Sequence, residues 1–228
     1  MTTIKEAIKR WEAANQRPIK DEVEVGFQFQ MPPIEKLDNN LSMLENCEKL
    51  YLSSNLMDKL SGLPRLKHLK ILSVARCKLL TLSGIEHVNE TLEELWASYN
   101  MIVKLSPLVS CKQLRVLYLN YNYVRDWAEI AKLAEHQFLK DVGFIDNPIC
   151  KNLDKEAWQN KMMKTLPRIN RLDGEFLATE DEAKDAKEIK QAIKHGTEIP
   201  PPPLQGTTST TNTSAQPSAP STADANPT

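Results

Sequence analysis

The sequence predicts an α/β solenoid in which about six short parallel strands form a concave face and a helix caps each end. Three observations predict this fold: a hydrophobic pattern that recurs at a fixed period, a helix-start signal before the first copy, and a second helical segment after the last copy. Repeats of this size stack along one axis because a single repeat cannot bury its own hydrophobic face.

The recurring pattern is LxxLxLxx(N/C)xL, and it occurs five times at a spacing of about 22 residues. The residues at its fourth position are Leu50, Leu72, Leu95, Leu117 and Val142. Successive side chains of a strand point to opposite faces, so the two leucines of LxL point inward and the residue between them points outward. The pattern is that of leucine-rich repeats.

The asparagine position of the pattern is polar in every copy. It holds Asn55, Cys77, Asn100, Asn122 and Asn147. An amide or a thiol buried at this turn can form hydrogen bonds with backbone groups of the neighbouring coils. We therefore expect a structural ladder along the solenoid, in which Cys77 is a structural residue and not a nucleophile.

The first coil is a degenerate copy. A step of about 23 residues back from the next coil aligns the segment FQFQMPPIEKLD, so that Phe27 and Phe29 are expected to point inward, followed by Ile34 and Leu37. Pro32 takes the asparagine position, which suits an edge strand because proline has no N–H to donate to a further ladder.

An N-terminal helix precedes this coil. Thr3 and Glu6 have the spacing of a capping box, and Ile4, Ile8 and Trp11 share one face of the helix that it opens. The helix is expected to cover the hydrophobic end of the stack.

A second helix follows the repeats. Asp154 opens it, and Trp158 and Met162 lie one turn apart, before Ile169 and Leu172 return to the repeat spacing. Beyond this cap the composition becomes highly charged and then rich in Thr, Ser and Pro, which predicts a weakly held helix and a disordered tail. The expected organisation is a capping helix over 1–22, repeats over 23–151, a C-terminal cap over 152–178, a charged helix over 179–196 and a tail over 197–228.

Composition and motifs argue against several functional classes. The formal net charge is -1, from 29 Lys+Arg and 30 Asp+Glu, so no overall field attracts nucleic acid. The 4 cysteines form no CxxC pair, the 4 histidines show no metal-binding spacing, and the 7 glycines form no phosphate-binding loop. No apolar run is long enough to span a membrane. We therefore expect a cytoplasmic, non-catalytic protein without cofactor or metal, and without a nucleic-acid or membrane partner.

The outward positions of the strands, and of the turns that follow them, are rich in aromatic residues. Most of the tyrosines lie there, although aromatic residues make up only 6% of the chain. Exposed apolar patches are kept small unless a partner covers them, and Tyr, Trp and Arg are enriched at interface hot spots. The predicted partner-binding residues are Tyr51, Ile71, Arg76, Glu94, Trp96, Tyr99, Val116, Tyr118, Tyr121 and Asp141.

Two plainer explanations of these residues stay open. Aromatic residues suit strands because of their β propensity, and cross-strand aromatic pairs stabilise sheets. Arg76 could serve only an intramolecular ion pair with Glu94, Asp141 or Asp146.

Several stretches resemble a known family. PPIEKLD, TLEELWASYN, YVRDWAEIAKLAE and RINRLDG occur in this order after the helix TIKEAIKRW, and TLEELWASYN and DWAEIAKLAE go beyond what the repeat pattern dictates. From about Thr2 to Glu182, the chain resembles the leucine-rich-repeat light chain 1 family of axonemal outer-arm dynein.

The resemblance implies a regulatory, non-catalytic subunit of ciliary dynein, located in the axoneme of a cilium or flagellum. It implies binding to an outer-arm dynein heavy chain at the microtubule-binding region of the stalk, and a contact with tubulin. Through the stretches SVAR and ELWASYN, it implies that Arg76, Trp96 and Tyr99 belong to the heavy-chain face. The alternative is a repeat scaffold of another complex, either a phosphatase regulator or a ribonucleoprotein scaffold.

Overall fold

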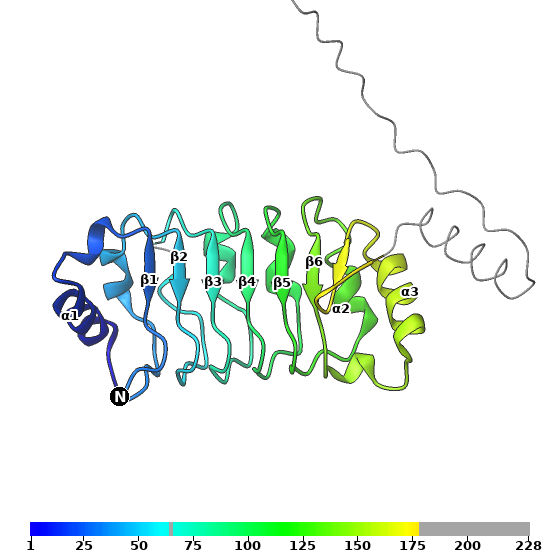
Figure 1. The fold of residues 1–228 in the computed structure, drawn as a ribbon, viewed down its shortest axis with the longest axis horizontal. Coiled ribbons are helices and arrows are strands. Elements are labelled where there is room, and N and C mark those ends of the chain that lie inside the picture. Colours follow the sequence, from blue (N-terminus) through cyan, green and yellow to red (C-terminus); the bar gives the residue numbers. More distant parts are fainter. Residues whose placement is uncertain (64–65, 178–228) are drawn as a thin grey trace, which may run out of the picture. The chain divides into compact units, whose positions relative to one another are not determined.

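The computed structural model describes residues 1–63 and 66–177, which form a series of stacked coils (Figure 1). The segments predicted as a charged helix over 179–196 and as a tail over 197–228 lie outside the described residues. The α-helices are α1 (Ile4–Asn15), α2 (Trp127–Ala131) and α3 (Lys155–Thr165). The strands are β1 (Glu24–Gly26), β2 (Lys49–Tyr51), β3 (Ile71–Ser73), β4 (Glu94–Trp96), β5 (Val116–Tyr118), β6 (Asp141–Gly143), β7 (Arg171–Leu172) and β8 (Glu175–Phe176).

The described strands form one 8-stranded sheet in the order of the sequence. Neighbours from β1 to β7 are parallel, and β7 and β8 form an antiparallel pair. The fourth-position residues of the repeats lie side by side in register, as Leu50 does with Leu72 and Leu95 with Leu117. The predicted fold class is confirmed, and the C-terminal cap extends the six predicted strands by β7 and β8.

The core lies between the sheet and the segments that return on the opposite side of each coil. These segments include short 3-10 helices such as Ile85–Val88 and Ser106–Ser110, because a coil of about 22 residues leaves room for little more than one turn. The inward leucines of the strands, such as Leu72 and Leu95, are fully buried. Each contributes roughly 1.5–3 kcal/mol to the free energy of unfolding through the hydrophobic effect.

Helix α1 covers the first coil at one end of the stack (Figure 1). Its capping box is formed: the Glu6 N–H donates to Thr3 Oγ1 (3.2 Å) and the Thr3 N–H donates to Glu6 Oε2 (2.9 Å). Ile4 and Ile8 are fully buried and Trp11 is half-buried against the core, as predicted from their spacing on one face.

Helix α3 covers the other end. Asp154 caps it by accepting a hydrogen bond from the Ala157 N–H (2.8 Å). Trp158 is buried, and its indole Nε1 donates to Asp173 Oδ2 (2.8 Å), which ties the helix to the turn between β7 and β8. The last coil of the sheet therefore does not leave its leucines open to water.

The register predicted for the first coil is wrong by two residues. Val25, and not Phe27, pairs with Leu50, while Phe29 has a φ of 51° and is 72% exposed. Two extra residues follow Phe29, so Ile34 keeps its predicted place and its N–H donates to Asn55 Oδ1 (2.9 Å). A shift of two residues preserves the inward side of a strand, which is why Phe27 is nevertheless buried.

The asparagine positions form hydrogen bonds between coils throughout the repeats. Asn100 shows the pattern: its Nδ2 donates to the carbonyls of Val74 and Ala97 (2.9 Å each), and its Oδ1 accepts from the N–H groups of Cys77 (3.1 Å) and Leu79 (2.9 Å). Asn55, Asn122 and Asn147 make equivalent contacts. These bonds link the turns of neighbouring coils into one continuous network.

Cys77 occupies this position with a thiol. Its Sγ donates to the carbonyl oxygen of Leu52 (3.3 Å), the contact that an asparagine Nδ2 makes to the preceding coil. Burial raises the pKa of the Cys77 thiol to about 11, so the side chain is a neutral donor at physiological pH and not a thiolate.

Candidate functional site

The outer surface of the sheet carries a stacked aromatic pair at its centre. Trp96 and Tyr118 are directly paired across β4 and β5, and their rings stack with centroids 4.6 Å apart and an interplanar angle of 7°. Trp96 Nε1 donates to Glu94 Oε2 (3.1 Å), and the Tyr118 hydroxyl donates to Asp141 Oδ1 (2.8 Å). Both acidic residues therefore hold the aromatic rings in place.

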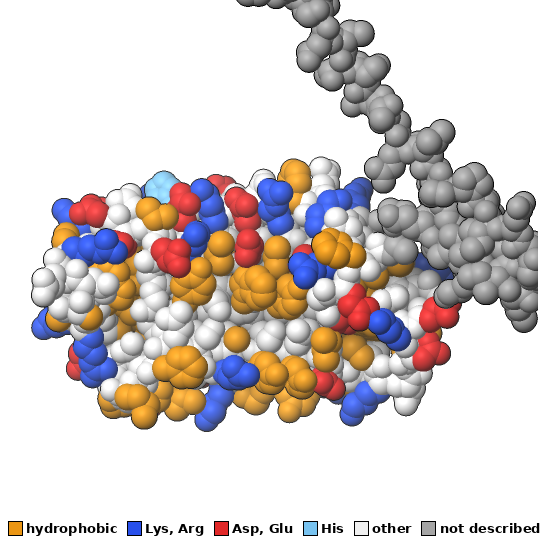
Figure 2. Space-filling model, viewed as in Figure 1, with side chains coloured by type: hydrophobic (Ala, Val, Ile, Leu, Met, Phe, Trp, Pro, Cys, Tyr) orange, Lys and Arg blue, Asp and Glu red, His pale blue; other side chains and the backbone are white. Residues whose placement is uncertain are grey.

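Apolar side chains continue this surface along the sheet. Ile71 and Val116 lie on either side of Glu94 in the same row, and Tyr51 lies two strands away from Trp96. Figure 2 shows the resulting band of hydrophobic side chains across the middle strands. We call the seven residues of this surface the strand face: Tyr51, Ile71, Glu94, Trp96, Val116, Tyr118 and Asp141.

A hollow of about 410 Å³ lies within this surface. Its lining combines the small residues Ser73, Ala75 and Ser98 with the aromatic residues Tyr51, Trp96 and Tyr99. A flat sheet would expose its aromatic rings evenly, whereas this arrangement creates a recess beside the stack. A bulky side chain of a partner could be received there.

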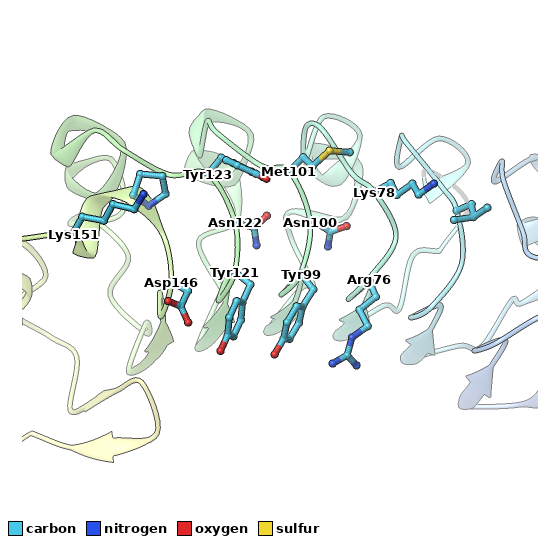
Figure 3. A pocket seen from close by; sticks show the side chains of 12 residues that line it. Arg76, Lys78, Tyr99, Asn100, Met101, Tyr121, Asn122, Tyr123, Asp146 and Lys151 are labelled. Atoms are coloured by element: carbon cyan, nitrogen blue, oxygen red, sulfur yellow. The ribbon is translucent and has the colours of Figure 1, made fainter.

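The other three predicted residues lie at the edge of the sheet. Arg76, Tyr99 and Tyr121 each follow a strand in the left-handed region, with φ of 54°, 58° and 55°. Tyr99 and Tyr121 stack with centroids 4.3 Å apart, and the Arg76 guanidinium lies 4.4 Å from the Tyr99 ring centroid (Figure 3). The predicted residues thus form two adjacent surfaces, which meet at the hollow because Arg76 and Tyr99 also line it.

The plainer explanation of Arg76 predicts an ion pair with Glu94, Asp141 or Asp146. Among the described residues, the ion pairs do not include Arg76, which interacts with Tyr99 instead. Asp141 Oδ2 lies 3.6 Å from Arg171 Nη1, and Asp141 Oδ1 accepts a hydrogen bond from the Tyr118 hydroxyl. Burial, followed by this bond to Asp141, raises the pKa of Tyr118 to about 12, so its hydroxyl stays a neutral donor.

A second row of exposed residues was missed from the sequence. Leu56, Met101 and Tyr123 follow the ladder asparagines and line a trough. Met101 and Tyr123 lie opposite Tyr99 and Tyr121 across it (Figure 3). The signal was present in the pattern, since the residue after the ladder position faces solvent and yet is apolar or aromatic in four coils, with Lys78 as the exception. Figure 2 shows hydrophobic side chains along this edge as well.

The described residues offer little for metal chemistry. Within residues 1–63 and 66–177, no three His, Cys, Asp or Glu side chains are grouped to hold a metal ion. Burial raises the pKa of Cys47 to about 12 and of Cys111 to about 11.

Over residues 1–63 and 66–177, every helix is too short or too polar to cross a membrane.

Comparison with known proteins identifies relatives over most of the chain. The family model for leucine-rich repeats in 2 copies matches residues 90–132. In fold, the chain is similar to an internalin from Listeria monocytogenes, with a TM-score of 0.52 and 19% identity over 64% of this chain and 39% of that one. This likeness bears on the fold alone.

Three curated relatives share one name, dynein axonemal light chain 1. The protein from Mus musculus is 49% identical over 186 residues, which is 81% of this chain and 98% of that one. The protein from Homo sapiens is 50% identical over 81% of this chain and 97% of its own length. The protein from Chlamydomonas reinhardtii is 38% identical over 76% of this chain and 89% of its own length. The chain therefore belongs to the axonemal dynein light chain 1 family, a family of the axoneme of cilia and flagella.

Proposed function

We propose that the chain is a non-catalytic regulatory light chain of ciliary outer-arm dynein that binds the heavy chain through the strand face. The heavy-chain segment bound is the microtubule-binding region of the stalk. In this role the light chain tunes how the motor engages the microtubule, and so the beating of the cilium. The family of the chain supports the dynein part of this proposal, and the strand face supports the mode of binding.

The observation that carries the proposal is the stacked Trp96 and Tyr118 pair at the centre of the strand face. Trp96 is 38% exposed, and Ile71 and Val116 extend the apolar surface beside it. Strand propensity explains why aromatic residues occur in strands, but it does not require them on the side that faces water. A surface with aromatic anchors at its centre and charged residues around them is typical of a protein interface.

The mechanism follows from rigidity and needs no covalent chemistry. A light chain bound at the stalk changes the affinity of the motor for its track only if it binds the two states of the motor with different affinities. The strand face can do so because its rings are held in place and do not follow a changing partner surface. A shift of the partner's anchor side chain out of the hollow would lose its contacts.

The relatives favour this proposal over a scaffold of another complex, such as a phosphatase regulator or a ribonucleoprotein scaffold. Those classes share the leucine-rich-repeat architecture, whereas the three curated relatives from Mus musculus, Homo sapiens and Chlamydomonas reinhardtii, which each align with at least three quarters of this chain, are dynein light chains by name.

The test is binding of the full chain to a purified stalk-tip domain of an axonemal outer-arm heavy chain. Removing the Trp96 ring with Trp96→Ala is expected to weaken binding by at least 10-fold, since a hot-spot aromatic contributes roughly 2 kcal/mol or more. Isothermal titration calorimetry gives the dissociation constant, and circular dichroism verifies that the fold is preserved.

The matched control is Phe138→Ala. Phe138 is 48% exposed, and it lines a separate pocket with Lys112 and Arg168. This variant is expected to bind like the wild type. Equal weakening by both substitutions would rule out the strand face as the binding surface, and no binding by the wild type would rule out the stalk tip as the partner.

A further inference from the structure

A trough runs along the edge of the solenoid, next to the strand face and distinct from it. One wall is formed by Arg76, Tyr99 and Tyr121, and the other by residues that include Lys78, Met101 and Tyr123 (Figure 3). Its volume is about 560 Å³. The trough crosses several coils, so it fits an elongated ligand better than a compact one.

The aromatic and apolar side chains on the walls of this trough are partly exposed, unlike the buried ladder amides at its base. Tyr99 and Tyr121 are each 43% exposed, Tyr123 is 54% exposed and Met101 is 36% exposed. The stack of Tyr99 and Tyr121 stiffens one wall. A continuous row of exposed aromatic and apolar side chains is typical of a binding surface.

The backbone of the trough has few groups left to bind an extended strand. The N–H groups of Tyr99 and Tyr121 donate to the next coil (2.8 and 2.7 Å), and those of Met101 and Tyr123 donate to the preceding coil (2.8 and 2.9 Å). The ladder amides at the base, such as Asn100, are likewise engaged. Strand addition needs free backbone groups, so a ligand must be held by side chains.

The rim of the trough carries three cations, Arg76, Lys78 and Lys151, and one carboxylate, Asp146, beside Tyr121 (Figure 3), so side chains that only donate outnumber the one that only accepts. Arg76 and Lys78 only donate, and the phenolic hydroxyls of the tyrosines can donate. A proline run is the complementary ligand, because it presents carbonyl acceptors and no N–H groups. Aromatic-lined grooves bind such runs in the polyproline II conformation, which loses little entropy on binding because it is already stiff.

The repeat distance of a polyproline II helix also agrees with the spacing of the coils. Three residues of polyproline II make one turn and advance about 9.3 Å, while two strand spacings measure about 9.6 Å. The same side of the ligand would therefore meet the same position of the repeat on every second coil, a position that Arg76 and Tyr121 occupy two coils apart. We infer that the trough binds a proline-rich segment in the polyproline II conformation, which a partner protein supplies.

The test uses a proline peptide and the full chain. The sequence contains one run of four prolines, Pro200–Pro203, outside the described residues, and the probe is a fluorescent peptide with the sequence of 198–206, EIPPPPLQG. The host protein has all four prolines of its own run replaced by serine, so that only the probe presents them. Fluorescence anisotropy is expected to show saturable binding, and Tyr123→Ala in this host is expected to weaken it at least 5-fold.

Two controls separate this site from the strand face and from non-specific binding. Trp96→Ala, which lies outside the trough, is expected to leave peptide affinity unchanged. A probe with serine in place of the four prolines is expected not to bind. The inference is overturned if the serine probe binds equally, if Tyr123→Ala has no effect, or if the proline probe does not bind at concentrations up to about 1 mM, which corresponds to roughly 4 kcal/mol.

Discussion

Asn100→Ala is predicted to be among the most destabilising single substitutions in this protein. The Asn100 side chain is buried and makes three donor and two acceptor contacts with the backbone of its own coil and the preceding one. Truncation removes all five. The Ala97 and Ser98 carbonyls keep bonds from Asn122 Nδ2 and the Arg76 N–H, whereas the Val74 carbonyl and the N–H groups of Cys77 and Leu79 lose their partner. A buried polar group left unpaired costs about 1–3 kcal/mol, and relaxation or an entering water recovers part of it.

These magnitudes give an expected loss of about 3–5 kcal/mol in the free energy of unfolding, at the upper end for one substitution. Urea denaturation followed by fluorescence and by circular dichroism measures it. With a slope of about 2 kcal/mol/M, the midpoint falls by roughly 2 M at an unchanged slope.

Asn160→Ala is the matched control for this prediction, because Asn160 is exposed on α3. It is expected to change the free energy of unfolding by less than about 0.5 kcal/mol. If Asn100→Ala costs no more than its control, then the ladder contributes nothing net, and the hydrophobic stacking of the coils alone holds the solenoid together.

Three further predictions concern the ladder, acid stability and the strand face. Cys77→Asn is expected to raise the free energy of unfolding by roughly 0.5–1 kcal/mol in urea denaturation, because an amide oxygen is a stronger acceptor than the thiol sulfur. Burial would raise the pKa of Glu129, but hydrogen bonds from Lys132, the Leu105 N–H and Lys104 outweigh it and hold that pKa below its ordinary value. Glu129 therefore contributes fully to the free energy of unfolding above the ordinary carboxyl pKa of about 4.3, and this contribution is lost as the pH falls through the lower pKa of the folded state. Glu129→Gln should consequently reduce the loss of stability on the acid side of a stability-against-pH curve. Gly143→Ala would place a Cβ 2.6 Å from Tyr118 Cδ1, so it should disturb the Trp96 stack, change the near-ultraviolet circular dichroism and weaken stalk-tip binding.

The sequence pattern predicts the repeats well because each coil repeats the same physical requirement. The inward leucines, the asparagine position and the two caps all follow from local spacing, and the structure shows them in place. The register predicted for the first coil was wrong for a reason that the pattern cannot reveal. Two extra residues after Phe29 leave the inward and outward sides of a strand unchanged, so Phe27 fits either register.

The division of the candidate site into a strand face and a trough was also beyond the sequence. It depends on the left-handed backbone at Arg76, Tyr99 and Tyr121, and none of these residue types favours a positive φ. The stacking of Trp96 on Tyr118 required the register between β4 and β5, which only the folded coils supply. Composition indicated that aromatic residues gather on one side, but not that they form two pairs with different neighbours.

The same ladder that stabilises the coils also prepares the strand face for binding. Each of the strands from β2 to β7 is bonded to two neighbours, and the turns after the strands are fixed by buried amides such as Asn100 and Asn122. The Trp96 and Tyr118 rings are stacked and hydrogen bonded before any partner arrives. Ordering side chains at an interface costs roughly 0.5–1.5 kcal/mol each, so a surface that is already ordered retains more of its contact energy as affinity. A substitution that loosens the ladder should therefore weaken binding at the strand face even though it touches no partner atom.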